Sequence, residues 1–176
     1  MLMPRETVPG LSVPLLGGGS FDIATADPGH ATLITFFRGL HCPICVGYLK
    51  ELERLTPQFA EKGVETVAIS SDSEERSAQM AEKVGTSALR MGHSLPLQVA
   101  RDWGLYISTG IGQEPAFFSE PGLFVVNKDR SLYFGSVQTM PFARPAFGDL
   151  LGAFDFVIAK NYPARGEYAG ELPSAA

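Results

Sequence analysis

The sequence is poor in cysteine, histidine and tryptophan, with two, three and one of these residues in 176. Two cysteines do not make the disulfide framework that stabilises small secreted domains. The apolar runs near Leu33 and Leu123 are too short to cross a bilayer. Residues 1–6 lack the basic and apolar segments of a secretory signal. We therefore expect a cytoplasmic protein without a membrane anchor.

Positive charge is also sparse. The chain has 14 Lys and Arg against 19 Asp and Glu, a net charge of −5, and no basic run. Nucleic acid and anionic membranes are therefore excluded as expected partners. A content of 45% hydrophobic and 19% charged residues is typical of a globular chain, and 176 residues suffice for a substantial core. We predict one domain over residues 1–176, with residues 161–176 as a loose tail.

Hydrophobic periodicity predicts strands that alternate with helices. The expected strands are two short ones at 13–16 and 20–23 joined by glycines, then 31–37, 64–70, 122–127 and 131–137; helices are expected from the cysteines to residue 62 and at 74–84, 95–103 and 147–158. Residues 105–122 show no period and are expected to form a long loop. The β-α-β unit implies parallel pairing and the late hairpin antiparallel pairing. This order predicts a three-layer α/β domain with a mixed central sheet and an N-terminal β-hairpin.

Local signals mark the expected helix ends. Lys62 and Gly63 are typical of a helix C-terminus. Ser71 and Glu74 have the spacing of a capping box. Pro145 is expected in the first turn of the last helix, where a missing N–H is tolerated.

Both cysteines lie in the stretch Cys42-Pro43-Ile44-Cys45, between a buried strand and an amphipathic helix. This spacing brings two sulfurs near enough to bond, and a helix N-terminus lowers a thiol pKa. We expect Cys42 to be the more exposed sulfur and the attacking thiolate, with Cys45 as the resolving thiol. Pro43 at an early helical position stiffens the turn without costing a hydrogen bond.

Two basic neighbours are candidates for tuning these thiols. Arg38 and, when protonated, His41 would stabilise a thiolate by their positive charge. A surface salt bridge for Arg38 and a merely exposed side chain for His41 are the alternatives.

The cysteines themselves have two other interpretations, inert buried residues or a zinc site. Zinc needs four protein ligands, or three and a water. Only His30, His41 and His93 are available to complete the set, and they form no H-x-x-x-H pair. We therefore expect neither a metal nor a cofactor, and expect His30 and His93 at the surface.

Three segments resemble the peroxiredoxin-like (AhpC/TSA) branch of the thioredoxin-like superfamily. They are Phe36-Phe37-Arg38-Gly39 ahead of the two cysteines, Gly122-Leu123-Phe124-Val125-Val126-Asn127-Lys128-Asp129, and Val137-Gln138-x-Met140-Pro141-Phe142-x-Arg144-Pro145. The resemblance covers residues 8–160. It implies a thioredoxin-like fold, a disulfide or peroxide substrate, a thiol reductant such as thioredoxin or glutathione, and a homodimer.

The chain departs from the peroxiredoxin pattern P-x-x-x-T/S-x-x-C. Laid onto this sequence, the pattern's cysteine falls on Cys45, its threonine on Cys42 and its proline on Arg38. The hydroxyl that helps to hold a peroxide is therefore missing. The arginine that the family places before the late strand is replaced by Glu120-Pro121-Gly122.

The chain also departs from thioredoxins, which carry a buried acid on the strand before the cysteines. Thr35 stands nearest to that position here. Thioredoxins have a cis-proline before a late strand, and Pro121 is its best match, which implies a cis bond there.

Three functions follow. The first is a thiol-disulfide oxidoreductase that cycles a Cys42–Cys45 disulfide. The second is an antioxidant thiol peroxidase, in which either cysteine attacks the peroxide and the other captures the sulfenic acid. The third is a redox sensor or binding module without turnover. Exposure of Cys42 separates them, because a buried sulfur favours the sensor or an inert role.

Overall fold

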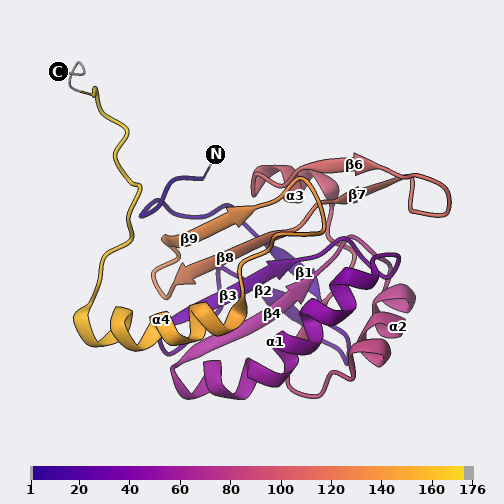
Figure 1. Cartoon of the computed structure of the whole chain (residues 1–176), viewed down its shortest axis with the longest axis horizontal. Helices are drawn as coiled ribbons and strands as arrows, with labels where there is room; N and C mark the ends of the chain where they lie inside the picture. Colours follow the sequence, from indigo (N-terminus) through magenta and orange to yellow (C-terminus); the bar gives the residue numbers. More distant parts are fainter. Residues whose placement is uncertain (1, 173–176) are drawn as a thin grey trace.

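The structure is a computed structural model and describes residues 2–172. Its centre is a five-stranded mixed sheet with the order β5-β4-β3-β8-β9 (Figure 1). The elements are the strands β1 (Ser12–Pro14), β2 (Ser20–Asp22), β3 (Ala31–Phe36), β4 (Val64–Ile69), β5 (Arg90–Gly92), β6 (Ile107–Thr109), β7 (Phe117–Ser119), β8 (Gly122–Asn127) and β9 (Leu132–Val137), and the helices α1 (Pro43–Glu61), α2 (Glu74–Val84), α3 (Leu97–Asp102) and α4 (Phe147–Lys160).

Strand direction in the central sheet follows the prediction. β3, β4 and β5 run parallel, β8 pairs antiparallel with β3, and β9 pairs antiparallel with β8. The N-terminal hairpin of β1 and β2 lies outside this sheet. The predicted mixed sheet and N-terminal hairpin are therefore confirmed.

Both faces of the central sheet are covered, because every residue of β3 is buried. Leu33 packs on one face with Leu49 of α1, Met80 of α2 and Phe154 of α4. Phe36 packs on the other face with Trp103, at the end of α3. Side chains alternate between faces along a strand, so this unbroken apolar run supplies both cores. Figure 1 shows α1, α2 and α4 together on one side of the sheet.

α1 follows the prediction at both ends. Cys42 is its N-cap residue, and Pro43 is the first helical residue. The helix continues through Pro57 to Glu61, and Gly63 then takes a left-handed φ of 71°. The strand-turn-helix connection therefore delivers both cysteines to one helix N-terminus.

α2 and α4 begin at Glu74 and Phe147 as predicted, but two of the predicted start signals are wrong. The N-cap of α2 is Ser73, not Ser71, and its hydroxyl accepts the Arg76 N–H at 3.4 Å. α2 begins at Glu74, so the residue directly before it has the geometry to cap the helix. Pro145 precedes Ala146, the N-cap of α4, and so lies outside the first turn.

The long loop expected over residues 105–122 is also wrong, because β6 and β7 form an antiparallel hairpin within it. The two strands pair only with each other and are partly exposed. Their residues therefore do not alternate between buried and exposed, so no period of two marks these strands in the sequence. The three-residue β5 was likewise missed, since so short a segment carries no period.

The chain after α4 forms neither helix nor strand through residue 172. Ala164 is nevertheless buried, and its carbonyl accepts a hydrogen bond from Arg5 Nε at 2.9 Å. Within residues 2–172, no helix is both long and apolar enough to span a membrane.

Candidate functional site

The two sulfurs lie in contact at the N-terminus of α1. Cys42 Sγ and Cys45 Sγ are 2.8 Å apart, and both residues are free thiols. Cys42 is 1% exposed and Cys45 0%. Both belong to the core on the α1 face of the sheet, with Phe37 and Phe147. Cys42 is thus barely more exposed than Cys45, and both sulfurs are buried because tertiary packing covers the first turn.

Arg144, from the segment between β9 and α4, reaches both sulfurs. Its Nη2 lies 3.0 Å from Cys45 Sγ and 4.0 Å from Cys42 Sγ. Its Nε and Nη1 are buried and have no hydrogen-bond partner among the described residues. A guanidinium that donates to sulfur favours thiolate over thiol.

Tyr48, one turn after Cys45 in α1, holds the Arg144 segment in place. Its hydroxyl donates to the Pro145 carbonyl at 2.8 Å, and its ring centre lies 4.9 Å from the Arg144 guanidinium carbon. Burial raises the pKa of Tyr48, so the hydroxyl stays protonated and remains a donor. Sequence reasoning did not single out Arg144 as a site residue, although the family-like segment before α4 contains it.

The pKa values of the two thiols are shifted in opposite directions. The hydrogen bond from Cys45 lowers the pKa of Cys42 to about 6, with help from the Arg144 and Arg38 charges and against the cost of burial. Burial raises the pKa of Cys45, as does the hydrogen bond with Cys42. Cys42 is therefore the more acidic thiol of the pair. The predicted roles of attacking Cys42 and resolving Cys45 require this order and stay predictions.

Arg38 forms the predicted alternative, a salt bridge, but a largely buried one. Its Nη2 lies 3.2 Å from Glu114 Oε1. Its Nε lies 3.2 Å from Glu120 Oε2, outside hydrogen-bond geometry. The guanidinium also lies 4.6 Å from the centre of the Phe118 ring. Two carboxylates thus offset the charge of Arg38, and it contributes least among the causes that lower the pKa of Cys42.

His41 fits neither of its predicted alternatives. Its side chain is 7% exposed, and its ring lies 4.6 Å from that of Phe118. Burial lowers the pKa of His41, and the neighbouring Arg38 charge lowers it further. The imidazole is therefore neutral at pH 7, neither a cation beside Cys42 nor an exposed side chain.

The turn before the cysteines is fastened by Asp72, which sequence reasoning missed. Its Oδ2 accepts the Leu40 N–H at 2.6 Å, and its Oδ1 accepts Arg76 Nε at 2.8 Å. Gly39 has a φ of 126°, and a Cβ there would lie 2.6 Å from Asp72 Oδ2. Only glycine combines this conformation with so close an approach.

The remaining predicted supporting residues are Pro121 and Pro43, and Thr35 was predicted nearest to the position of the thioredoxin acid. Pro121 is buried directly before β8, and residues 2–172 contain no cis peptide bond, so the cis bond expected at Pro121 is wrong. Thr35 is buried on the same face of β3 as Leu33, and its hydroxyl has no partner among the described residues. Pro43 is exposed in the first turn of α1.

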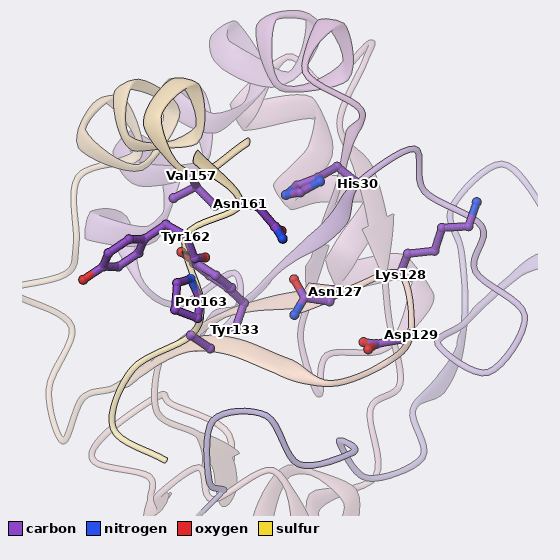
Figure 2. Close-up of a pocket in the computed structure, with 10 residues that line it drawn as sticks. His30, Asn127, Lys128, Asp129, Tyr133, Val157, Asn161, Tyr162 and Pro163 are labelled. Atoms are coloured by element: carbon purple, nitrogen blue, oxygen red, sulfur yellow. Dashed lines mark hydrogen bonds between the residues drawn. The ribbon is translucent and has the colours of Figure 1, made fainter. Parts of the chain in front are cut away.

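A polar hollow of about 360 Å³ lies at the opposite end of the sheet (Figure 2). His30 and Asn161 point into it, and His30 directly precedes β3, whereas Cys42 follows the other end of that strand. Neither cysteine lines this hollow, so it is separate from the thiol site.

The remaining histidine departs from its prediction. His93 is buried rather than at the surface, and its Nδ1 lies 3.0 Å from the Ser94 hydroxyl. Among residues 2–172, no three His, Cys, Asp or Glu side chains gather as metal ligands.

Comparison with known proteins identifies the family. The sequence profile of the AhpC/TSA family matches residues 4–134, which include the cysteine turn and β8. The chain belongs to the AhpC/TSA family. Family membership makes it an oxidoreductase in coarse terms. No curated relative matches the chain by sequence.

Solved structures share the fold across nearly the whole chain. The peroxidoxin BcpB from Mycobacterium tuberculosis has a TM-score of 0.71 at 20% identity and covers 90% of this chain and 99% of its own. AhpC from Enterococcus faecalis gives 0.73 at 17%, covering 92% and 98%. Reduced Prx3 from Vibrio vulnificus, solved in complex with hydrogen peroxide, gives 0.74 at 16%, covering 88% and 97%. At these identities the similarity shows the fold alone and confirms the predicted thioredoxin-like architecture.

Proposed function

We propose that this protein is a thiol peroxidase that reduces hydrogen peroxide or small organic hydroperoxides. One observation carries the proposal: two sulfurs 2.8 Å apart share the Arg144 guanidinium, and the pKa of Cys42 is about 6. A thiolate at neutral pH is the species that attacks peroxide. AhpC/TSA membership and a relative of the same fold solved with hydrogen peroxide support the choice.

In the proposed reaction, the Cys42 thiolate attacks the terminal oxygen of the peroxide. The S–O bond forms as the O–O bond breaks, and the leaving alkoxide or hydroxide takes a proton from solvent. Cys42 becomes a sulfenic acid. The Cys45 thiol then displaces water from Cys42 and forms the Cys42–Cys45 disulfide. Two equivalents of an external thiol return the pair to its reduced form.

Burial of the site favours peroxide over the first predicted substrate, a disulfide. Cys42 is only 1% exposed, and in-line attack on a protein disulfide needs a sulfur open to a bulky partner. A peroxide of a few atoms requires far less opening. The same burial is what we expected of a sensor or an inert pair, but a lowered thiol pKa serves neither of these unless the sulfur reacts.

Turnover with hydrogen peroxide tests this function. Reduced protein should lose two thiols per peroxide, much faster than free cysteine at the same pH. Cys42→Ser should abolish this reaction. Cys45→Ser should still consume one equivalent and stop at a sulfenic acid that a dione reagent traps. Thiol loss no faster than that of free cysteine would remove the proposal, and trapping on Cys45 in place of Cys42 would reverse the assigned roles.

Thiol-disulfide exchange is the second candidate, because the Cys-x-x-Cys spacing suits an intramolecular disulfide. If the protein catalyses this exchange, it should turn over a small disulfide such as oxidised glutathione, and Cys42→Ser should abolish that turnover. For either reaction we propose a thiol reductant, thioredoxin or glutathione, and a cytoplasmic homodimer as the working form.

A further inference from the structure

The segment between β9 and α4, residues 138–146, is attached to the thiol site by one charged side chain. We call this segment the strap. Arg144 Nη2 lies 3.0 Å from Cys45 Sγ and 4.0 Å from Cys42 Sγ. Because the guanidinium contacts both sulfurs, it faces the negative charge of the reduced pair on whichever sulfur carries it. The thiols therefore help to hold the strap in place.

Few other polar contacts hold the strap, and its backbone is strained. Within the described chain, residues 139–145 make no backbone–backbone hydrogen bond, and Phe142 is 56% exposed. Ala143 has a φ of 55°, a left-handed conformation that is unfavourable for a residue with a Cβ. The other anchor is the Pro145 carbonyl, which accepts the Tyr48 hydroxyl at 2.8 Å. A segment with so few hydrogen bonds opens readily when one anchor is lost.

Arg144 depends on the sulfurs for its counter-charge. None of the salt bridges within residues 2–172 includes Arg144, and its Nε and Nη1 are buried without a hydrogen-bond partner. The Tyr48 ring, 4.9 Å from the guanidinium carbon, is uncharged. The negative charge in contact with this guanidinium is therefore the thiolate. Loss of one partner of a buried ion pair is strongly destabilising, because the other charge is left uncompensated.

Formation of the disulfide removes that thiolate. In the proposed reaction, the Cys42 thiolate and the Cys45 thiol react with a hydroperoxide to give the disulfide, an alcohol and a hydroxide ion. Two electrons pass from the sulfurs to the O–O bond, and the negative charge leaves as hydroxide. The sulfurs are already 2.8 Å apart, so the first turn of α1 needs little movement. Oxidation therefore leaves the Arg144 guanidinium buried against a neutral disulfide.

We propose that the strap is a redox-sensitive switch, docked on the reduced pair through Arg144 and released when the Cys42–Cys45 disulfide forms. The inference rests on the proposed function, whose catalytic cycle it regulates. Both sulfurs are buried under the docked strap, and its release opens the disulfide to the thiol reductant. Reduction restores the thiolate, which binds Arg144 again. The peroxide thus reacts at a closed site and the reductant at an open one.

Proteolysis at the strap measures the release. Chymotrypsin cleaves after aromatic residues, and its cleavage rate at Phe142 follows the population in which the strap is free. At pH 8, oxidation of the wild type with diamide should raise this rate by about tenfold or more, since a buried charge loses its partner. Tyr168, 66% exposed in the segment after α4, is the internal reference, and cleavage there should not change. Mass spectrometry of the fragments separates the two sites.

Variants identify the cause of the release. Arg144→Met has no charge to strand, so its strap should be cleaved at one rate in the reduced and the oxidised protein. Arg165→Met, the matched control, should keep the difference found in the wild type. Cys42→Ser/Cys45→Ser has no thiolate and should be cleaved as fast as the oxidised wild type without any oxidant. Cys42→Asp/Cys45→Ser keeps a negative charge and should resist cleavage with or without diamide.

The outcomes separate the switch from the function on which it rests, because diamide forms the disulfide without peroxide. Equal cleavage at Phe142 in the reduced and the oxidised wild type would overturn the switch, even with rapid peroxide reduction. A redox difference that persists in Arg144→Met, or slow cleavage of the double serine variant, would overturn it as well. A wild type that shows the switch but reduces no peroxide would remove the peroxidase proposal alone.

Discussion

At the scale of single residues, Arg144 is the positively charged group that contacts both thiols. Its guanidinium reaches both sulfurs, and Tyr48 fixes the segment that carries it. It occupies the thiol site although Glu120-Pro121-Gly122 stands where the family arginine was expected. The positive charge that is missing from residues 120–122 is thus supplied by the segment between β9 and α4.

Replacing Arg144 with Met should raise the pKa of Cys42 from about 6, because a charge that stabilises the thiolate is lost. Less thiolate is then present at pH 7, so the rate with hydrogen peroxide should fall by about twofold for a rise of one pKa unit. Thiolate absorbance followed against pH measures the first effect and stopped-flow kinetics the second. Arg165→Met, in the exposed segment after α4, is the control. An unchanged titration in Arg144→Met would contradict the assignment.

Gly39 is the residue of this turn at which any substitution causes strain. Gly39→Ala combines a φ of 126° with a Cβ 2.6 Å from Asp72 Oδ2. We expect the free energy of unfolding to fall by about 2–4 kcal/mol, from backbone strain and the displaced carboxylate. Urea denaturation measures it.

Gly47→Ala is the matched control for this change, because Gly47 lies in α1 with open space around its Cα. Alanine is the better helix former, so this variant should gain about 0.5–1 kcal/mol. Equal effects of the two substitutions would show that the turn before the cysteines is not strained against Asp72.

At the scale of elements, the β6–β7 hairpin is tied to the cysteine turn by buried charge. Arg38 extends from the turn, Glu114 and Glu120 come from the hairpin side, and the Glu120 carboxylate also accepts the Ser108 hydroxyl at 2.7 Å. The side chain of Glu120 is only 4% exposed. The hairpin makes no strand pairing with the central sheet, and these contacts act together with the buried Phe118 ring to hold it against the cysteine turn.

Glu120→Gln should therefore destabilise the protein strongly, by about 3–5 kcal/mol, because it leaves a buried guanidinium partly uncompensated. The exposed pair of Glu65 and Arg90, 2.8 Å apart with both side chains 39% exposed, provides the comparison. Glu65→Gln should cost less than about 1 kcal/mol. Thermal and urea unfolding of both variants measure the difference, and a cost for Glu120→Gln as small as that for Glu65→Gln would refute this role of the pair.

At the scale of the whole molecule, the thiol site is part of the hydrophobic core. Cys42 and Cys45 pack within the same cluster as residues of α1, α2, α4 and the central sheet. The ionisation of Cys42 is therefore coupled to folding. Its pKa is about 6 in the folded protein against an ordinary value of 9.0, so the thiolate stabilises the native state.

This coupling predicts how the stability of the reduced protein varies with pH. A lowered pKa gives stability that is fully present above pH 9 and is lost as the pH falls through 6. The unfolding free energy should thus rise between pH 6 and 9, by at most about 4 kcal/mol, relative to Cys42→Ser. Above that range the raised pKa of Cys45 acts in the opposite direction. Parallel curves for the two proteins would show that Cys42 is not the thiolate.

Local patterns in the sequence determined much of the framework. The apolar run before the cysteines predicted β3, and the spacing of Leu49, Leu52 and Phe59 predicted the buried face of α1. Gly63 predicted the end of that helix. These features depend on side-chain period and backbone preference within a few residues, which the sequence displays directly. The Cys-x-x-Cys turn at the start of α1 is likewise a local feature that the sequence displays directly.

Tertiary structure alone decided the chemistry around that turn. Arg144 lies 99 residues from Cys45 and Glu114 lies 76 residues from Arg38, so no local pattern links the members of either pair. The burial of Cys42 and the neutral His41 depend on elements packed against them from distant parts of the chain. A thiol pKa is set by every charge and surface around the sulfur. The sequence therefore determined where the two thiols lie, and the packed fold decided which of them is the more acidic.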